Sequence, residues 1–213
     1  GLLPDRVTDT GAHWALNIDS GTEWEERAPL PQAKNHHSAL AVDGLIYVFG
    51  GELGHDQVHY EGPWHDVPNM HRYNPATDSW IKLGDLPTPL SHVEPSCFVV
   101  NGHIVFMGGR TGHYDVAEAW HYSPQHDEWL PLPALPERGR GVAALLIDDS
   151  IYVAGGRYYR TAISANVWKG DLNVGWDKVL QPSAATYFVA RNCIPQYTEF
   201  SCSENAEAPN LPT

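Results

Sequence analysis

Hydrophobic residues in this chain form short runs, and one arrangement of those runs occurs three times. Residues 40–51, 98–109 and 145–156 each contain an apolar run, a two-residue turn, a second apolar run and a pair of glycines. The runs show little alternation of polar and apolar positions, which is typical of strands that neighbouring sheets cover on both faces. A unit repeated at this spacing cannot bury its own faces, so the pattern predicts a solenoid or a propeller of stacked units.

Each unit is predicted to contain four antiparallel strands. The dipeptides at 43–44 (Asp-Gly) and 101–102 (Asn-Gly) accept the positive φ angles of a two-residue turn, so the runs beside them form a hairpin, strands one and two. Residues 73–80 and 122–129 begin with Tyr, end with Trp and have turn-forming centres, which predicts strands three and four. The Trp that ends strand four is expected to pack against the next sheet.

A tryptophan and a proline mark the end of each unit. Trp24, Trp80, Trp129 and Trp176 recur at spacings of 56, 49 and 47 residues, and a proline stands seven residues after each of the first three. Together with the glycine pair and the Tyr-x6-Trp element, this Trp-x6-Pro connector resembles the kelch repeat. The resemblance covers roughly residues 1–178 and implies an all-β fold, a kelch-type β-propeller with four-stranded blades around a central channel.

Shorter motifs indicate a more specific resemblance within the kelch proteins. They are His13-Trp14, Asn35-His36, Ser91-His92 and two copies of Gly-Gly-x-x-Gly-His. These motifs are similar to those of secreted kelch proteins grouped with galactose-oxidase-like propellers. The resemblance therefore implies an extracellular, secreted location.

The repeats predict an incomplete ring. Three glycine pairs stand among four tryptophans, so the first Trp belongs to a unit that lacks its own hairpin. We expect a partial propeller of about three and a half blades that belongs to a six-bladed ring. The predicted boundaries are the last two strands of an incomplete blade at 1–28, blades at 29–83, 84–133 and 134–180, and a non-repeat C-terminal tail at 181–213.

The remaining blades are expected as partners of this chain, because an open propeller leaves an unpaired apolar face and strand edge. They would be residues upstream of Gly1, a separate cleaved chain or a second copy of the molecule. Gly1 fits the second glycine of a divided pair, and a residue left from a tag is the alternative. A four-bladed ring completed by residues 184–190 is the competing arrangement.

The net charge indicates which classes of partner are favoured. The formal charge of −13 and the pI near 5.2 disfavour nucleic acid and anionic membranes and favour cationic partners or metal ions. No run approaches the ~18 apolar residues of a membrane helix.

Cys97 is expected to be a small buried hydrophobe, whereas Cys193 and Cys202 either form a disulfide or remain two free thiols.

Candidate functional residues gather at one end of the units. Antiparallel strands bring the connector that enters strand one and the loop after the glycine pair to the same end, which we call the mouth. Function is expected there because the strands are committed to packing. The candidate ligand-binding residues are His36, His37, Glu52, His92, Glu94, Arg110, Arg138, Arg140 and Arg157. Two extra residues before the second glycine pair leave either His92 or Glu94 as the equivalent of His36.

The mouth is rich in histidine, and histidine and carboxylate groups on converging loops suit a divalent metal such as zinc or copper, with calcium as a further candidate. The candidate metal ligands are His36, His55, His92 and His113. Alternatively, these histidines cap loops through hydrogen bonds to the backbone. The arginines would bind carboxylates of an acidic peptide or sugar, or would pair with nearby Asp and Glu.

These features favour a binding or assembly module whose mouth contacts a protein, glycan or metal. The alternative is an enzyme acting on sugars, either mutarotase-like or metal-dependent. The resemblance to galactose oxidase does not extend to its Tyr-Cys copper site, because Cys97 lies inside a predicted strand and the next blade has Arg140-Gly141-Val142 where the Tyr is needed. No catalytic residue is nominated for this reason.

Overall fold

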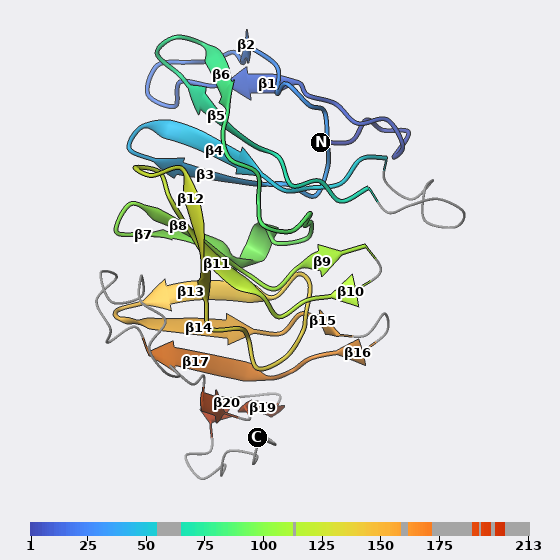
Figure 1. The fold of residues 1–213 in the computed structure, drawn as a ribbon, viewed down its shortest axis with the longest axis vertical. Helices are drawn as coiled ribbons and strands as arrows, with labels where there is room; N and C mark the ends of the chain where they lie inside the picture. Colours follow the sequence, from blue (N-terminus) through green and yellow to red (C-terminus); the bar gives the residue numbers. More distant parts are fainter. Residues whose placement is uncertain are drawn as a thin grey trace.

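The structure, a computed structural model, describes residues 1–54, 65–112, 114–158, 162–171, 189–191, 193–196 and 199–202. Apart from the short 3-10 turn η1 (Glu94–Ser96), the secondary structure of these residues consists of β-strands. They form three four-stranded antiparallel sheets that stack side by side (Figure 1). The all-β fold with four-stranded units predicted from the repeats is therefore confirmed.

The three sheets follow the chain in order. The first sheet contains β3 (Ser38–Val42), β4 (Leu45–Phe49), β5 (Met70–Asn74) and β6 (Ser79–Lys82). The second contains β7 (Cys97–Val100), β8 (His103–Met107), β11 (Ala119–Ser123) and β12 (Glu128–Leu132). The third contains β13 (Ala143–Ile147), β14 (Ser150–Ala154), β17 (Val167–Asp171) and β18 (Val189–Arg191).

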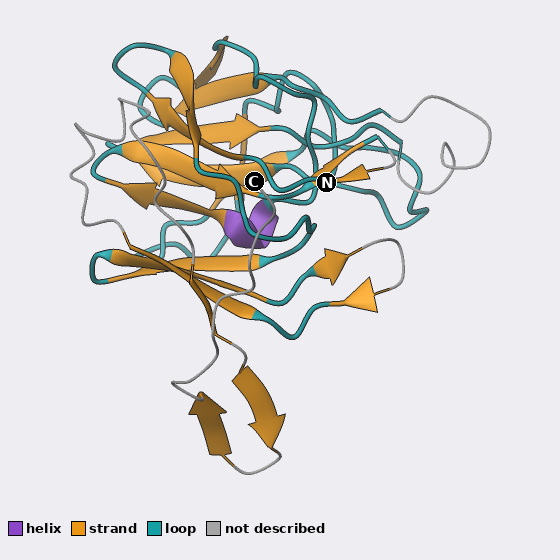
Figure 2. Ribbon diagram, turned by 60° about the horizontal axis from the view of Figure 1, so that its bottom comes forward, coloured by secondary structure: helices purple, strands orange, loops and turns teal. Residues whose placement is uncertain are grey.

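Four two-stranded ribbons accompany the sheets within the described residues. Their strands are β1 (His13–Ala15) with β2 (Glu25–Arg27), β9 (Arg110–Thr111) with β10 (Tyr114–Asp115), β15 (Arg157–Tyr158) with β16 (Ala162–Ile163), and β19 (Cys193–Gln196) with β20 (Glu199–Cys202). In Figure 2 the ribbon β19–β20 stands apart from the three sheets. Among the described residues, the structure has no helix with the length and apolarity needed to cross a membrane.

The first two hairpins form for the reason the sequence suggested. Asp43 and Gly44 have φ angles of 49° and 74°, and Asn101 and Gly102 have φ angles of 48° and 77°. These left-handed conformations at both turn positions match the right-handed twist of the paired strands. The pairs β3–β4 and β7–β8 accordingly align without an offset from the turn outward.

Two hydrophobic clusters lie between the sheets. One joins the first and second sheets and includes Phe49, Phe106 and Tyr122, and the other joins the second and third sheets. The Trp129 ring on β12 lies 5.8 Å from the Phe49 ring of the first sheet. The expectation that this Trp packs on the next sheet is therefore wrong: it packs on the preceding one. Its aromatic neighbours are Phe49 on β4 of the preceding sheet and Phe106 and Tyr122 on β8 and β11 of its own sheet.

The fourth strand of the third sheet lies further along the chain than the other repeats suggest. Its edge strand β18 pairs with β17 through Trp168 and Ala190, within the segment that the sequence analysis assigned to a tail. The predicted end of this blade, Trp176, lies outside the described residues. The predicted boundaries between blades remain predictions.

The mouth is built by short bridges between connectors and loops. Asn35 pairs with Glu52, Ser91 with Arg110, and Arg140 with Arg157, so each entering connector lies beside the loop that follows the glycine pair of its own sheet. The amide nitrogens of Gly51 and Gly109 also donate to Leu90 O and Gly139 O, both at 2.7 Å, in the connector of the next sheet. The ribbons β9–β10 and β15–β16 project at this end (Figure 1).

Candidate functional site

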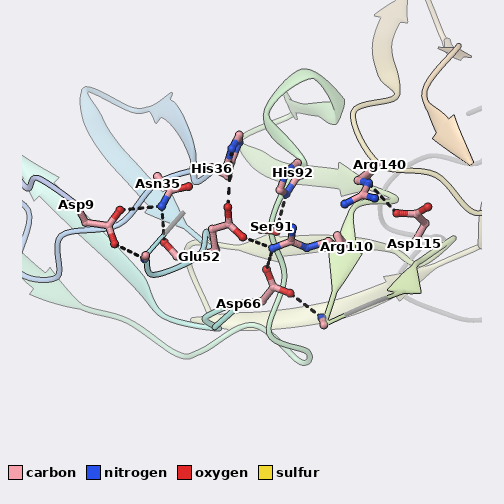
Figure 3. A network of polar contacts seen from close by, with 12 residues as sticks. Asp9, Asn35, His36, Glu52, Asp66, Ser91, His92, Arg110, Asp115 and Arg140 are labelled. Carbon is pink, nitrogen blue, oxygen red and sulfur yellow. Dashed lines mark hydrogen bonds and ion pairs between the residues drawn. The ribbon is translucent and has the colours of Figure 1, made fainter. Parts of the chain in front are cut away.

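A buried ionic network forms the floor of the mouth (Figure 3). Arg110 Nη2 donates to Glu52 Oε2 and, at 2.8 Å, to Asp66 Oδ1. Asp66 Oδ2 in turn accepts a 2.6 Å hydrogen bond from the amide nitrogen of Gly112. The three charged side chains are only 2–4% exposed. Because Glu52 and Asp66 belong to the first repeat and Arg110 to the second, the network ties adjacent sheets together.

A second ion pair links the second and third sheets. Arg140 Nε lies 3.0 Å from Asp115 Oδ1, and both side chains are largely buried. Pairing with nearby carboxylates, one of the two roles considered for the mouth arginines, is therefore the one that Arg110 and Arg140 adopt. Arg138 and Arg157 remain exposed.

His36 and His92 lie face to face above this floor. Their ring centroids are 4.1 Å apart and their planes differ by 14°. Both residues have positive φ angles, 47° and 61°, just before their sheets begin. This shared conformation identifies His92 as the equivalent of His36, and Glu94 fills a different role by contacting His36 Nδ1 through Oε1 at 3.0 Å.

The surroundings of His36 and His37 shift the pKa values of these two rings in opposite directions. The hydrogen bond to Glu94 raises the pKa of His36, with the charges of Glu94 and Glu52 acting in the same direction. His36 Nε2 lies 3.9 Å from Glu52 Oε1, and His92 Nδ1 lies 2.7 Å from Ser91 Oγ. Burial instead lowers the pKa of His37 to about 4, so that this ring is neutral at pH 7.

The structure thus brings together part of the predicted metal set. His36, His92 and Glu52 each offer a ligand atom, and these atoms lie within 4.8 Å of one another. Glu52 was predicted as a ligand-binding residue but not as a metal ligand. His55 and His113 lie outside the described residues, so their part in the set remains a prediction.

Asp9 is a mouth residue that the sequence analysis missed. Its carboxylate accepts hydrogen bonds from Asn35 Nδ2 at 2.7 Å and from the amide nitrogen of Gly54 at 2.8 Å. Asp9 precedes the first complete repeat, so no repeat register could place it. The hydrogen-bonding roles of Asp66 and Ser91 and the ion pair of Asp115 were also not predicted.

The three cysteines lie on β-strands of the described structure. Cys97 is half-buried at the start of β7 and donates to Glu94 O at 3.4 Å. Burial raises the pKa of its thiol, which favours the protonated, unreactive form. The backbone register of β19–β20 places Cys193 opposite Cys202, and their disulfide remains a prediction.

Comparison with known proteins decides the family. The domain described as the KLHDC2/KLHL20/DRC7 Kelch-repeats domain matches residues 7–173. The chain belongs to the kelch-repeat family. Its fold is accordingly that of a kelch β-propeller, here in partial form, and such propellers are typically protein-binding or assembly modules.

Relatives of this kelch chain occur in fungi and animals. It is 32% identical to Kelch-like protein terF of Aspergillus terreus over 169 residues, which cover 75% of this chain and 36% of the relative. It is 27% identical to Kelch-like protein 36 of Bos taurus over 144 residues, which cover 67% of this chain and 22% of the relative. The chain therefore spans about a fifth to a third of the length of these two relatives.

A solved structure shares the fold of the kelch chain. The structure of YjhT superposes with a TM-score of 0.69 at 17% sequence identity, over 90% of this chain and 61% of that one. At this level of sequence identity, the match supports a shared fold alone. The predicted galactose-oxidase-like subgroup receives no specific support from these matches.

Proposed function

We propose that this chain is a propeller module that binds a protein partner through the rim of its mouth. The observation that carries this proposal is the contrast between a buried, internally paired floor and an exposed rim of aromatic, apolar and basic side chains. On the ribbons beside the floor, Tyr114 is 69% exposed and Ile163 is 85% exposed. Arg138 and Arg157 are exposed at the same end.

The composition of this rim suits a protein more than a small molecule. Tyrosine and arginine are enriched at the energetic centres of protein interfaces, because each combines a large contact area with a hydrogen-bonding end. Exposed apolar groups such as Ile163 gain free energy when a partner removes them from water. Arg138 and Arg157 favour acidic groups on the part of the partner that they contact.

The floor supports binding by holding the rim in place. Arg110 and Arg140 are fixed by buried ion pairs that connect neighbouring sheets. A surface fixed in this way loses little conformational entropy when a partner binds. We infer that the network preserves the shape of the mouth, while contacts with the partner come from the ribbons.

Site-specific photo-crosslinking tests the proposal. A photoreactive amino acid replaces Tyr114 in one variant and Asp149, in the exposed turn at the opposite end of the third sheet, in a control. We expect a discrete crosslinked protein from position 114 and none from position 149. With that protein purified, Tyr114→Ala and Arg157→Glu should each weaken binding by about tenfold or more, as interface residues of these types do.

Two outcomes contradict this function. Equal crosslinking at positions 114 and 149 would mean that the contacts are unspecific. Unchanged affinity in both substituted variants would place the interface elsewhere. Turnover of simple sugars by the purified chain would instead favour the enzyme considered in the sequence analysis.

A further inference from the structure

Three side chains from three different loops meet at the mouth with groups that metals prefer. His36 enters the first sheet, Glu52 leaves the same hairpin after its glycine pair, and His92 enters the second sheet (Figure 3). Their ligand atoms lie within 4.8 Å of one another. Two imidazoles and one carboxylate form a donor set typical of zinc and related divalent ions.

Glu52 provides an independent sign that a ligand belongs there. Its side chain is 2% exposed, and no hydrogen bond from the described residues reaches its Oε1 atom. This oxygen faces His36 Nε2 at 3.9 Å, which is too long for a hydrogen bond. Leaving a buried carboxylate oxygen without a close partner costs free energy, and a cation between Glu52 and the histidines would remove that cost.

The residues around the group have the arrangement found around metal ligands. Glu94 contacts Nδ1 of His36 at 3.0 Å, and Ser91 Oγ contacts Nδ1 of His92 at 2.7 Å. In metal sites such contacts at one ring nitrogen orient the histidine and assign the other nitrogen to the metal. Arg110 similarly holds Glu52 through its other carboxylate oxygen, Oε2.

The local charge favours a cation as well. The carboxylates of Glu52, Asp66 and Glu94 lie in this contact network, and the guanidinium of Arg110 compensates only part of their charge. A divalent ion beside the histidines would complete the neutralisation. The electrostatic interaction is strong because Glu52, Asp66 and Arg110 are buried, where the effective dielectric constant is low.

We propose that His36, Glu52 and His92 bind one divalent transition-metal ion, with zinc as the best match. Ligand atoms of a tetrahedral zinc site lie about 3.3 Å apart, given zinc–nitrogen distances of about 2.0–2.1 Å. The stacked rings must therefore turn toward one another, and the loops must close slightly when the ion binds. A zinc ion bound by three protein ligands keeps a fourth coordination position for water or another ligand. This site does not depend on the proposed protein partner.

Metal titration of the purified chain tests the site. After removal of metals with a chelator, Zn²⁺ is titrated by calorimetry and Co²⁺ by its visible absorption, which reports tetrahedral coordination. We expect one high-affinity ion per chain, and a zinc-dependent rise in thermal stability, because an ion that binds only the folded state stabilises it. His92→Ala and His36→Ala should each weaken this binding by at least about 100-fold, and Glu94→Gln by about 10–100-fold.

A matched histidine serves as the control. His126 is exposed in the turn of the second sheet, far along the chain from the three ligands, and His126→Ala should bind zinc as the unsubstituted chain does. Glu52→Gln is a further test. Because Arg110 loses a charged partner in that variant, the free energies of unfolding of Glu52→Gln and of the unsubstituted chain are compared without metal. The two histidine variants keep the test decisive if Glu52→Gln does not fold.

Two results would overturn the proposal. One is the absence of a high-affinity ion on the folded, unsubstituted chain. The other is unchanged affinity and unchanged Co²⁺ absorption in His36→Ala and His92→Ala, which would place the ion on other histidines. Neither result bears on the crosslinking test, which is performed with chelator present.

Discussion

His121 couples folding to pH through its burial. Its side chain on β11 is fully buried, and its Nδ1 lies 3.4 Å from Nδ1 of His103. Burial and the nearby His103 lower the pKa of His121 to about 4, whereas a histidine in an unfolded chain has a pKa of about 6.5. Between these values the unfolded state binds more protons, so acidification in this range destabilises the folded state.

Replacing His121 should weaken this pH dependence. His121→Leu removes the titrating ring, so its free energy of unfolding should fall less between pH 7 and pH 5 than that of the unsubstituted chain, by about 1–2 kcal/mol. Chemical denaturation at both pH values measures the difference. An equal fall in the free energy of unfolding for His121→Leu and the unsubstituted chain would show that burial of His121 does not cause the pH dependence.

The histidines of the mouth illustrate how far residue-level prediction reaches. The repeat register placed His36 and His92 in entering connectors at the same end, and histidine and carboxylate groups on converging loops suggested a metal. The partners of these residues were not predictable, because Glu94 and Glu52 approach His36 from a neighbouring connector and from the loop after the glycine pair. Such contacts depend on the distance between sheets, which a repeat pattern does not contain.

At the scale of elements, the second glycine of each pair allows the backbone of a connector to approach. Gly109 has a φ of 108°, and an added Cβ would lie 2.5 Å from Val93 Cγ1 and 2.9 Å from Ser91 O. Gly109→Ala should therefore destabilise the chain by about 3–5 kcal/mol through backbone strain and steric overlap. Thermal or chemical unfolding measures this loss.

Gly102 offers a matched control for that substitution. Its φ is also positive, at 77°, but an added Cβ would have no neighbour within 4 Å. Gly102→Ala should cost only about 1–2 kcal/mol, which is the conformational penalty alone. A similar loss in both variants would show that close approach of the connector does not explain the glycine pair.

The turn between β11 and β12 joins two sheets through one carboxylate. Asp127 Oδ1 accepts a 2.8 Å hydrogen bond from the Tyr122 hydroxyl and a 3.0 Å hydrogen bond from the amide nitrogen of Gly84, in the connector after the first sheet. Asp127→Ala should cost about 2–3 kcal/mol, since two hydrogen bonds are lost and their donors stay behind. Asp148 is exposed in the turn between β13 and β14 with a φ of 52°, against 51° for Asp127. Asp148→Ala therefore measures the backbone penalty alone, and an equal loss in both variants would rule out the contribution of the contact between sheets.

This contact repeats, yet the sequence revealed only part of it. Asp78 accepts hydrogen bonds from Tyr73 at 2.6 Å and from the amide nitrogen of Ala28 at 2.9 Å, as Asp127 does in the next unit. The Tyr-x6-Trp pattern predicted the turn between the strands, because Asp, Asn and Pro favour turns. It did not predict that the Asp side chain reaches the preceding connector, or that Trp129 faces Phe49 of the preceding sheet.

For the whole molecule, the stack of sheets was predictable and its end was not. The hairpins and glycine pairs recur with enough similarity to fix three four-stranded sheets. The edge strand β18 (Val189–Arg191) carries none of the repeated motifs, and the sequence analysis considered residues 184–190 only as the segment that would complete a four-bladed ring. An edge strand contacts only one neighbour, which leaves its sequence less constrained than that of an inner strand.

In the described part of the chain, the outer face of the third sheet carries exposed apolar side chains. Leu145 and Ile147 lie on the same face of β13 and are 61% and 51% exposed, whereas Ala144 and Leu146, which alternate with them, pack toward the second sheet. In a closed propeller another blade would cover such a face. We therefore expect the 213-residue chain to associate as its concentration rises, because contiguous apolar surface favours contact with any complementary face.

Two substitutions on this face should suppress the association without unfolding the chain. Leu145→Lys with Ile147→Glu replaces exposed apolar groups, so its free energy of unfolding should stay within about 0.5 kcal/mol of the original. Sedimentation velocity over a range of concentrations should shift the unsubstituted chain above its 23.6 kDa monomer mass and leave the double variant monomeric. Ile81→Lys, at a position 45% exposed on β6 of the first sheet, serves as the control and should still associate. A monomer at every concentration, or equal association in the double variant, would mean that this face does not mediate association.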